Sequence, residues 1–268
     1  MSNTSTFIEL EGVVNSRDLG GMKTRDGAVV RSGKLIRSGH LANATPSAVA
    51  RLSGLIDTVV DFRTVMEREQ NPDAVIPGVI SHHMSILEGR TMTPNKKNDV
   101  PDERPKRRLM TDRSEVAGNF ANMYRGFIAN EHSRAQYAKF FRILLEDHDR
   151  AVLWHCSAGK DRAGTASILV ETVLGMDRDS ITEDYLLTNS FNREENAGIR
   201  ERLRIENGGE LSDEIWNAMI MLFIADESYI SALYDEAEKQ FGSLEGYITE
   251  GLGITPAEQE RLRAMYLE

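Results

Sequence analysis

The first third of the chain alternates short apolar runs with turn residues, a pattern typical of β-strands separated by tight turns. The run at residues 56–62 (IDTVVDF) is apolar and rich in β-branched residues, and it predicts a buried strand. Shorter strands are predicted at residues 28–31 and 34–37, and a weaker one at residues 75–86, where a proline and a glycine interrupt the run. A Thr-Pro pair at residues 45–46 predicts the start of a helix.

Apolar residues recur at helical spacing beyond about residue 115, and Tyr124 falls on the apolar face of the first such helix. A short apolar strand is predicted at residues 151–154, and the pattern after it is almost wholly helical. Strands linked by helices indicate an α/β fold with a central, mainly parallel sheet flanked by helices. We expect one domain over residues 1–268, with a helical extension or lid over residues 192–268.

Composition and charge narrow the possible functions. Hydrophobic residues make up 40% of the 268 residues and charged residues 28%, which is ordinary for a globular chain. The formal net charge is −10, so we expect no nucleic-acid partner, because phosphate backbones need a basic surface. Residues 88–114 differ from the rest in being rich in proline, lysine and arginine, and we expect a mobile, locally basic loop there.

The cysteine content points to a reducing compartment. Cys156 is the single cysteine of the chain, so no internal disulfide can form. The N-terminus has neither a basic region nor a long apolar run, and no segment is long and apolar enough to span a bilayer. We therefore expect a cytoplasmic protein without stable membrane insertion, although export without a conventional signal peptide stays open.

The most informative segment lies between the predicted strand at residues 151–154 and the helix that follows it. Cys156 opens this segment and Arg162 closes it, so both belong to a strand-to-helix turn. Such a turn aims successive backbone N–H groups and a helix N-terminus at one point, which binds a phosphate-like anion. The same electrostatic field favours the thiolate form of a cysteine, and the planar guanidinium of arginine can bind two phosphate oxygens at once.

This arrangement predicts covalent phosphate-ester hydrolysis. The Cys156 thiolate would attack phosphorus, the ester oxygen would leave, and water would hydrolyse the resulting cysteinyl-phosphate. The loop amides and Arg162 would stabilise the phosphoryl oxygens in the transition state. Because the loop supplies the positive charge, we expect neither a metal ion nor a cofactor. Gly159 would allow the tight turn and a close approach of the backbone to the anion.

Residues 155–162 read His-Cys-Ser-Ala-Gly-Lys-Asp-Arg, which resembles the His-Cys-x-x-Gly-Lys-Asp-Arg signature of the atypical bacterial protein tyrosine phosphatases. Other segments resemble motifs of the same family and occur in the same order along the chain. They are residues 15–21 (NSRDLGG), 33–41 (GKLIRSGHL), 60–63 (VDFR), 184–189 (DYLLTN) and 241–247 (FGSLEGY). Several motifs in the family order are more specific than the cysteine loop alone, and the resemblance implies a tyrosine-phosphatase-like fold.

The resemblance also implies roles for individual residues. Cys156 would be the nucleophile, Arg162 would bind the phosphoryl group, and Asp161 would be the general acid. Asp61 is the alternative acid, because it ends a strand that we expect beside the loop strand. The residues around the phosphate, or around inorganic phosphate after the reaction, would be Ser157, Ala158, Gly159, Lys160, Asp161 and Arg162.

The resemblance implies a protein tyrosine phosphatase or a dual-specificity phosphatase, with a phosphoinositide phosphatase as the alternative. Members of the family act on phosphotyrosine, on phosphoserine or phosphothreonine, and on phosphoinositides, and Lys160 resembles the extra lysine that lipid phosphatases use for a second phosphate. Ala163 replaces the Thr or Ser that usually follows the arginine, so a phosphate-binding module with little turnover is a further alternative. Arg17, Arg63 and His155 are secondary candidates for the site.

Overall fold

The computed structural model describes residues 3–88, 112–206, 209 and 211–268. Its described residues form one mixed sheet of six strands in the order β1-β2-β3-β6-β4-β5. The neighbours β3, β6, β4 and β5 are parallel, and β1 and β2 add an antiparallel edge. The predicted α/β fold with a mainly parallel sheet is therefore confirmed. The strands are β1 (Thr6–Phe7), β2 (Arg17–Asp18), β3 (Leu35–Ser38), β4 (Ile56–Asp61), β5 (Ile80–His83) and β6 (Ala151–His155).

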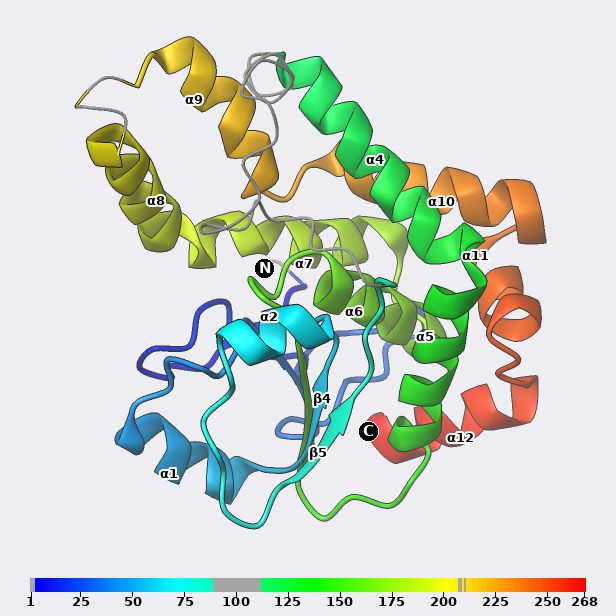
Figure 1. Ribbon diagram of the computed structural model, residues 1–268. Coiled ribbons are helices and arrows are strands. Elements are labelled where there is room, and N and C mark those ends of the chain that lie inside the picture. The colour runs from blue at the N-terminus through cyan, green and yellow to red at the C-terminus, as the bar shows by residue number, and fades with distance from the viewer. Residues whose placement is uncertain (1–2, 89–111, 207–208, 210) are drawn as a thin grey trace.

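Helices cover both faces of this sheet, and α8 and α9 extend away from it on the side where α4 begins (Figure 1). Among the described residues, none of the helices combines the length and the apolar composition that crossing a bilayer requires. The helices before β6 are α1 (Pro46–Leu55), α2 (Val65–Gln70), α4 (Arg113–Ala129) and α5 (Glu131–Leu144). Those after it are α6 (Arg162–Leu174), α7 (Arg178–Phe191), α8 (Arg193–Glu206), α9 (Asp213–Met219), η1 (Ile220–Leu222), α10 (Glu227–Phe241), α11 (Leu244–Gly246), η2 (Tyr247–Gly251) and α12 (Pro256–Tyr266).

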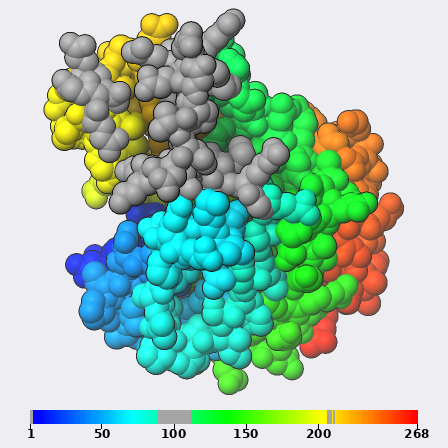
Figure 2. Space-filling view, viewed as in Figure 1, coloured from blue at the N-terminus to red at the C-terminus, as the bar shows by residue number. Residues whose placement is uncertain are grey.

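Alternation along β6 divides the buried side chains between two cores. Ala151 and Leu153 face the smaller core with Leu52 of α1, whereas Val152 and Trp154 face the larger one. The larger core includes buried residues of α4, α5, α6, α7, α10 and α12. In the space-filling view the green α4–α5 region and the orange and red C-terminal helices form one continuous surface (Figure 2). The C-terminal helices thus share a core with the central strand.

The strand predicted at residues 56–62 is confirmed, and the strand predicted at residues 28–31 is wrong. The apolar run at residues 56–62 forms β4, and the Thr-Pro pair at 45–46 starts α1, where the Thr45 hydroxyl accepts a hydrogen bond from the amide of Ala48. Residues 28–31 form isolated bridges instead of a strand, because neighbouring residues there pair with single residues of two different segments. Most of the expected basic loop at residues 88–114 lies outside the described residues, and its end forms the start of α4.

The parallel strands place their carboxyl ends along one edge of the sheet. Ser38, which ends β3, and Asp61, which ends β4, are both paired in register with His155 at the end of β6. The expectation that the strand of Asp61 neighbours the loop strand is therefore confirmed. Ligand sites of open α/β sheets form at this edge, and the loop that starts at Cys156 leaves β6 there.

Candidate active site

The loop at residues 156–161 brings a cysteine and an arginine to one pocket at the carboxyl edge of the sheet. Cys156 follows β6 directly and is buried, and Arg162 is the first residue of α6. Both line a pocket of about 270 Å³, together with Asp161 and Glu67. The apolar part of its lining consists of Val14, Leu87, Phe120, Met123, Ile199, Leu222 and Phe223. The pocket therefore combines charged groups around the cysteine with an apolar wall.

The shape of the loop depends on Gly159, whose φ is +68°. A Cβ at this position would lie 2.5 Å from the carbonyl oxygen of Ser38, so only glycine fits. The carbonyl of Gly159 accepts a hydrogen bond from Arg37 Nη2 at 2.8 Å, and that of Ala158 accepts one from Asn15 Nδ2 at 3.1 Å. Side chains of two other segments of the chain therefore hold two successive peptides of the loop.

Arg162 is held by a carboxylate from a different element. Its Nη1 and Nη2 donate to Glu67 of α2 at 2.7 and 2.8 Å, and the Ser157 hydroxyl donates to the same carboxylate at 2.6 Å. Burial alone would raise the pKa of Glu67, but the hydrogen bonds and charge of Arg162 outweigh burial and lower it to about 2. A guanidinium has more N–H groups than this pair uses, so Arg162 can bind an anion while Glu67 holds it.

Lys160 and Asp161 are neighbours in the loop but have different surroundings. The Lys160 ammonium is buried and donates to the carbonyls of Leu222 and Ile224 at 2.9 and 3.0 Å, which ties the loop to η1. The side chain of Asp161 is 21% exposed and lines the pocket. Its Oδ1 accepts a hydrogen bond from the Tyr124 hydroxyl at 2.9 Å. Both residues line the pocket, and of their two side chains that of Asp161 is the more exposed.

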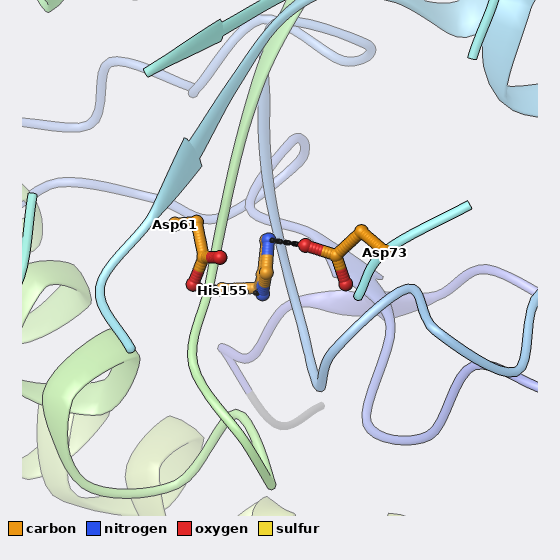
Figure 3. A group of neighbouring side chains, drawn as sticks. All are labelled: Asp61, Asp73 and His155. Carbon is orange, nitrogen blue, oxygen red and sulfur yellow. Dashed lines mark ion pairs between the residues drawn. The ribbon is translucent and has the colours of Figure 1, made fainter. Parts of the chain in front are cut away.

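His155 and Asp61 belong to a buried ion-pair cluster beside the pocket. His155 lies between Asp61 and Asp73 (Figure 3), with its Nε2 3.3 Å from Asp73 and its Nδ1 3.8 Å from Asp61. Arg63 forms a bidentate pair with Asp61, in which its Nε and Nη2 donate to the two carboxylate oxygens at 3.0 and 2.9 Å. The structure places none of His155, Asp61 and Arg63 in the lining of the pocket. Of the three, His155 contacts the loop backbone, since its Nδ1 lies 3.3 Å from the carbonyl oxygen of Cys156.

The same cluster has side chains of the kinds that bind metal ions. One ligand atom each of Asp61, Asp73 and His155 lies within 4.8 Å of the others. However, Arg63 Nη2 already contacts both carboxylates, at 2.9 Å from Asp61 and 2.5 Å from Asp73. This guanidinium supplies positive charge beside the buried carboxylate of Asp61 and the partly buried one of Asp73. In this structure the cluster is therefore held together by ion pairs with Arg63.

Arg17 lies in a second buried cluster, outside the lining of the pocket. Its Nη2 and the Nη1 of Arg37 each lie 3.5 Å from Asp184 Oδ2. Arg37 also donates to the carbonyl of Gly159, so the cluster contacts the back of the loop. Three of the segments that resemble family motifs meet here, which indicates that they support the shape of the loop.

Sequence reasoning missed several residues that shape the site. Glu67 had a usable signal, because Thr64 and Glu67 have the spacing of a capping box directly after β4 and both of its hydrogen bonds are present. Tyr124 has the spacing of a core residue, and nothing in the sequence shows that its hydroxyl reaches Asp161. Asn15 is close to Arg17 in the same motif, but its contact with Ala158 spans 143 positions.

The sequence matches the tyrosine phosphatase family over residues 8–268. It is 30% identical to a protein of Cupriavidus necator that is provisionally named a tyrosine-protein phosphatase, over 97% of this chain and 88% of that protein. It is 29% identical to the triple specificity protein phosphatase PtpB of Mycobacterium tuberculosis, over 97% of this chain and 98% of that protein. A tyrosine-protein phosphatase of Nostoc commune is 25% identical over 83% of this chain and 69% of that protein.

Replacing Glu67 by Gln should remove a pH-dependent part of the stability. Because the pKa of Glu67 falls from 4.5 to about 2 on folding, its ionic contribution is full above about pH 5 and disappears as the pH falls toward 2. Glu67→Gln should therefore lower the free energy of unfolding by about 3 kcal/mol near pH 7 and by clearly less near pH 3. Urea unfolding at both pH values measures this difference.

The matched control for this change is Glu69→Gln, which alters an exposed glutamate of the same helix. It should change the free energy of unfolding by less than about 0.5 kcal/mol. A loss of equal size at both pH values in Glu67→Gln would contradict the ion pair with Arg162.

Replacing Gly159 by Ala should displace the loop, because a Cβ there meets the backbone of Ser38 in addition to the strain of a positive φ. We expect a loss of more than about 2 kcal/mol in the free energy of unfolding. Gly78→Ala is the matched control, since Gly78 has a φ of +76° and open space around its Cβ position. It should cost about 1 kcal/mol. Equal losses in the two variants would contradict the close packing against Ser38.

Proposed function

The chain belongs to the tyrosine phosphatase family, and on that basis we propose that it hydrolyses phosphoric monoesters through a cysteinyl-phosphate on Cys156, without a metal ion. The observation that carries the proposal is the meeting of Cys156 and Arg162 in one pocket, at the two ends of a strand-to-helix loop. The loop fits a tetrahedral dianion because its amides, its helix N-terminus and Arg162 all supply positive charge. The preferred substrate in this proposal is phosphotyrosine in a protein.

In the first step the Cys156 sulfur attacks phosphorus, so that an S–P bond forms as the ester P–O bond breaks. The leaving oxygen takes a proton from Asp161. Water then attacks the cysteinyl-phosphate and gives its proton to the Asp161 carboxylate, and the S–P bond breaks to release inorganic phosphate. Arg162 and the loop amides neutralise the charge on the non-reacting oxygens throughout.

Asp161 is a better general acid than Asp61 on two grounds. Its carboxyl lines the pocket, whereas Asp61 is buried outside the lining and bonded to Arg63. An acid must also be able to approach the leaving oxygen, and the 21% exposure of the Asp161 side chain meets this condition. Asp61 and Arg63 then serve the site indirectly, by fixing the end of β4 and the position of His155.

Two features of the pocket favour an aryl phosphate over a phosphoinositide. The side chains of Phe120, Met123 and Phe223 provide apolar surface for a phenyl ring beside the charged loop. The ammonium of Lys160 donates to two main-chain carbonyls and lies 4.6 Å from the centre of the Phe120 ring, so it is not free to bind a second phosphate. In this proposal the contribution of Lys160 to phosphate binding comes from its main-chain amide.

The proposal also concerns the domain organisation of the chain, the compartment in which it works and the rate of the second step. The pocket draws residues from the N-terminal loops and from the helices after residue 192, which favours a single functional unit. A nucleophilic thiolate works only while it is reduced, so a reducing compartment such as the cytoplasm suits Cys156. Ala163 is fully buried and offers no hydroxyl to the sulfur, so slow turnover of the intermediate is compatible with the site.

Replacing Cys156 by Ser should lower the hydrolysis of 4-nitrophenyl phosphate by at least about 1000-fold, because the hydroxyl is a much weaker nucleophile at neutral pH. Arg162→Lys keeps the charge but loses the fork, and it should lower kcat/KM by about 100-fold or more. Addition of a chelator should leave the rate of the natural chain unchanged. Steady hydrolysis by Cys156→Ser, or inhibition by the chelator, would contradict the proposed mechanism. Phosphate binding without any hydrolysis by the natural chain would favour the binding module.

Substrate preference should follow the apolar wall of the pocket. We expect kcat/KM for a phosphotyrosine peptide to exceed that for the matched phosphoserine peptide and for a monophosphorylated phosphoinositide by about tenfold or more. The measurement is phosphate release from the three substrates at equal concentration. Phe120→Ala should reduce this preference, because it removes part of the ring-binding surface. A higher kcat/KM for the phosphoinositide would overturn the assignment of phosphotyrosine.

A further inference from the structure

We propose that Tyr124 is a positioning residue that orients the carboxyl group of Asp161 for proton transfer, and that Tyr185 supports it in turn. The inference rests on the proposed function, in which Asp161 is the general acid. Neither tyrosine lines the pocket, so both would act only through Asp161.

Hydrogen bonds connect the side chains of Tyr185, Tyr124 and Asp161, which come from three different segments. Tyr124 of α4 donates its hydroxyl proton to Asp161 Oδ1 at 2.9 Å, and its oxygen lies 2.8 Å from the hydroxyl oxygen of Tyr185 in α7. Both tyrosines are almost completely buried, at 0% and 1% exposure. Their rings also contact each other edge to face, with centroids 6.2 Å apart, which limits the movement of the hydroxyl groups.

The number of protons on each group decides which group donates each of these hydrogen bonds. A hydroxyl has one proton, and an ionised carboxylate has none to give. While Asp161 is ionised, Tyr124 must therefore use its proton on Asp161, and its oxygen then accepts the proton of Tyr185. Burial, together with the negative charge of Asp161, raises the pKa of both tyrosines well above 10, so both keep the proton that they donate.

The two oxygens of the Asp161 carboxyl group have different contacts. Within the described part of the chain, the Tyr124 hydroxyl and the Lys160 ammonium both lie near Oδ1, at 2.9 and 3.3 Å. When Asp161 is protonated, this arrangement favours the proton on Oδ2, because Oδ1 is already an acceptor. Two donors on one oxygen thus leave the transferable proton on the other.

The hydrogen bond from Tyr124 should also strengthen as the reaction proceeds. A hydroxyl binds a carboxylate more strongly than a neutral carboxylic acid. As Asp161 gives its proton to the leaving oxygen, negative charge develops on the carboxyl group and the bond from Tyr124 stabilises it. The effect should be larger for a poor leaving group, because proton transfer is then more important to the barrier.

The test compares two substrates of nearly equal shape, 4-nitrophenyl phosphate with a good leaving group and phenyl phosphate with a poor one. Asp161→Asn should lower kcat/KM for phenyl phosphate by about 100-fold or more and affect the nitrophenyl ester much less. Tyr124→Phe should show the same selectivity at a smaller size, about tenfold for phenyl phosphate. The double variant should be little worse than Asp161→Asn alone, since Tyr124 acts through Asp161.

Two further variants guard against loss of folding as an explanation. Tyr185→Phe removes the second hydroxyl and should give a weaker loss with the same selectivity for phenyl phosphate, which tests the chain even if Tyr124→Phe does not fold. Tyr266→Phe removes a buried hydroxyl that donates to the carbonyl of Leu144, far along the chain from the loop. It should lower the midpoint of thermal unfolding without any selectivity between the two esters.

The outcomes separate this inference from the proposed function. If Asp161→Asn affects both esters equally, Asp161 is not the general acid and the proposed function is wrong at this residue. If Asp161→Asn is selective but Tyr124→Phe and Tyr185→Phe lower both rates equally, the tyrosines are only structural and the inference is wrong. Full additivity in the double variant would also overturn it.

Discussion

The ion pair between Arg162 and Glu67 is the interaction on which the site depends most directly. Arg162 starts α6, and Glu67 lies in the first turn of α2, so the pair joins two elements that leave different strands of the sheet. Both groups are largely buried, and each would be costly to bury alone. The guanidinium therefore has one favourable position, beside Cys156 and at the mouth of the loop.

The loop itself is held from several directions, and each contact constrains a different peptide. Gly159 allows the backbone to turn against Ser38, while Arg37 and Asn15 bind the carbonyls of neighbouring peptides. Lys160 connects the loop to η1 in the C-terminal helices. A loop held in this way can present its amides to an anion without rearranging, which is the condition for electrostatic stabilisation of a transition state.

The sequence predicts the elements whose local pattern agrees with their final surroundings. The run that forms β4 and the capped start of α1 are of this kind, and so is the strand-to-helix turn between Cys156 and Arg162. Individual side-chain contacts between distant segments could not be predicted, because no local pattern encodes them. Glu67 reaches Arg162 across 95 positions and Tyr124 reaches Asp161 across 37.

Acid quenching of the enzyme during turnover, followed by mass spectrometry of its peptides, tests the central claim that Cys156 carries the phosphoryl group. The account predicts that a phosphoryl group is found on the peptide that contains Cys156, and that it disappears when substrate is exhausted. Steady turnover of 4-nitrophenyl phosphate with no phosphoryl group on Cys156 at any quench time, or with one on another residue, would contradict it.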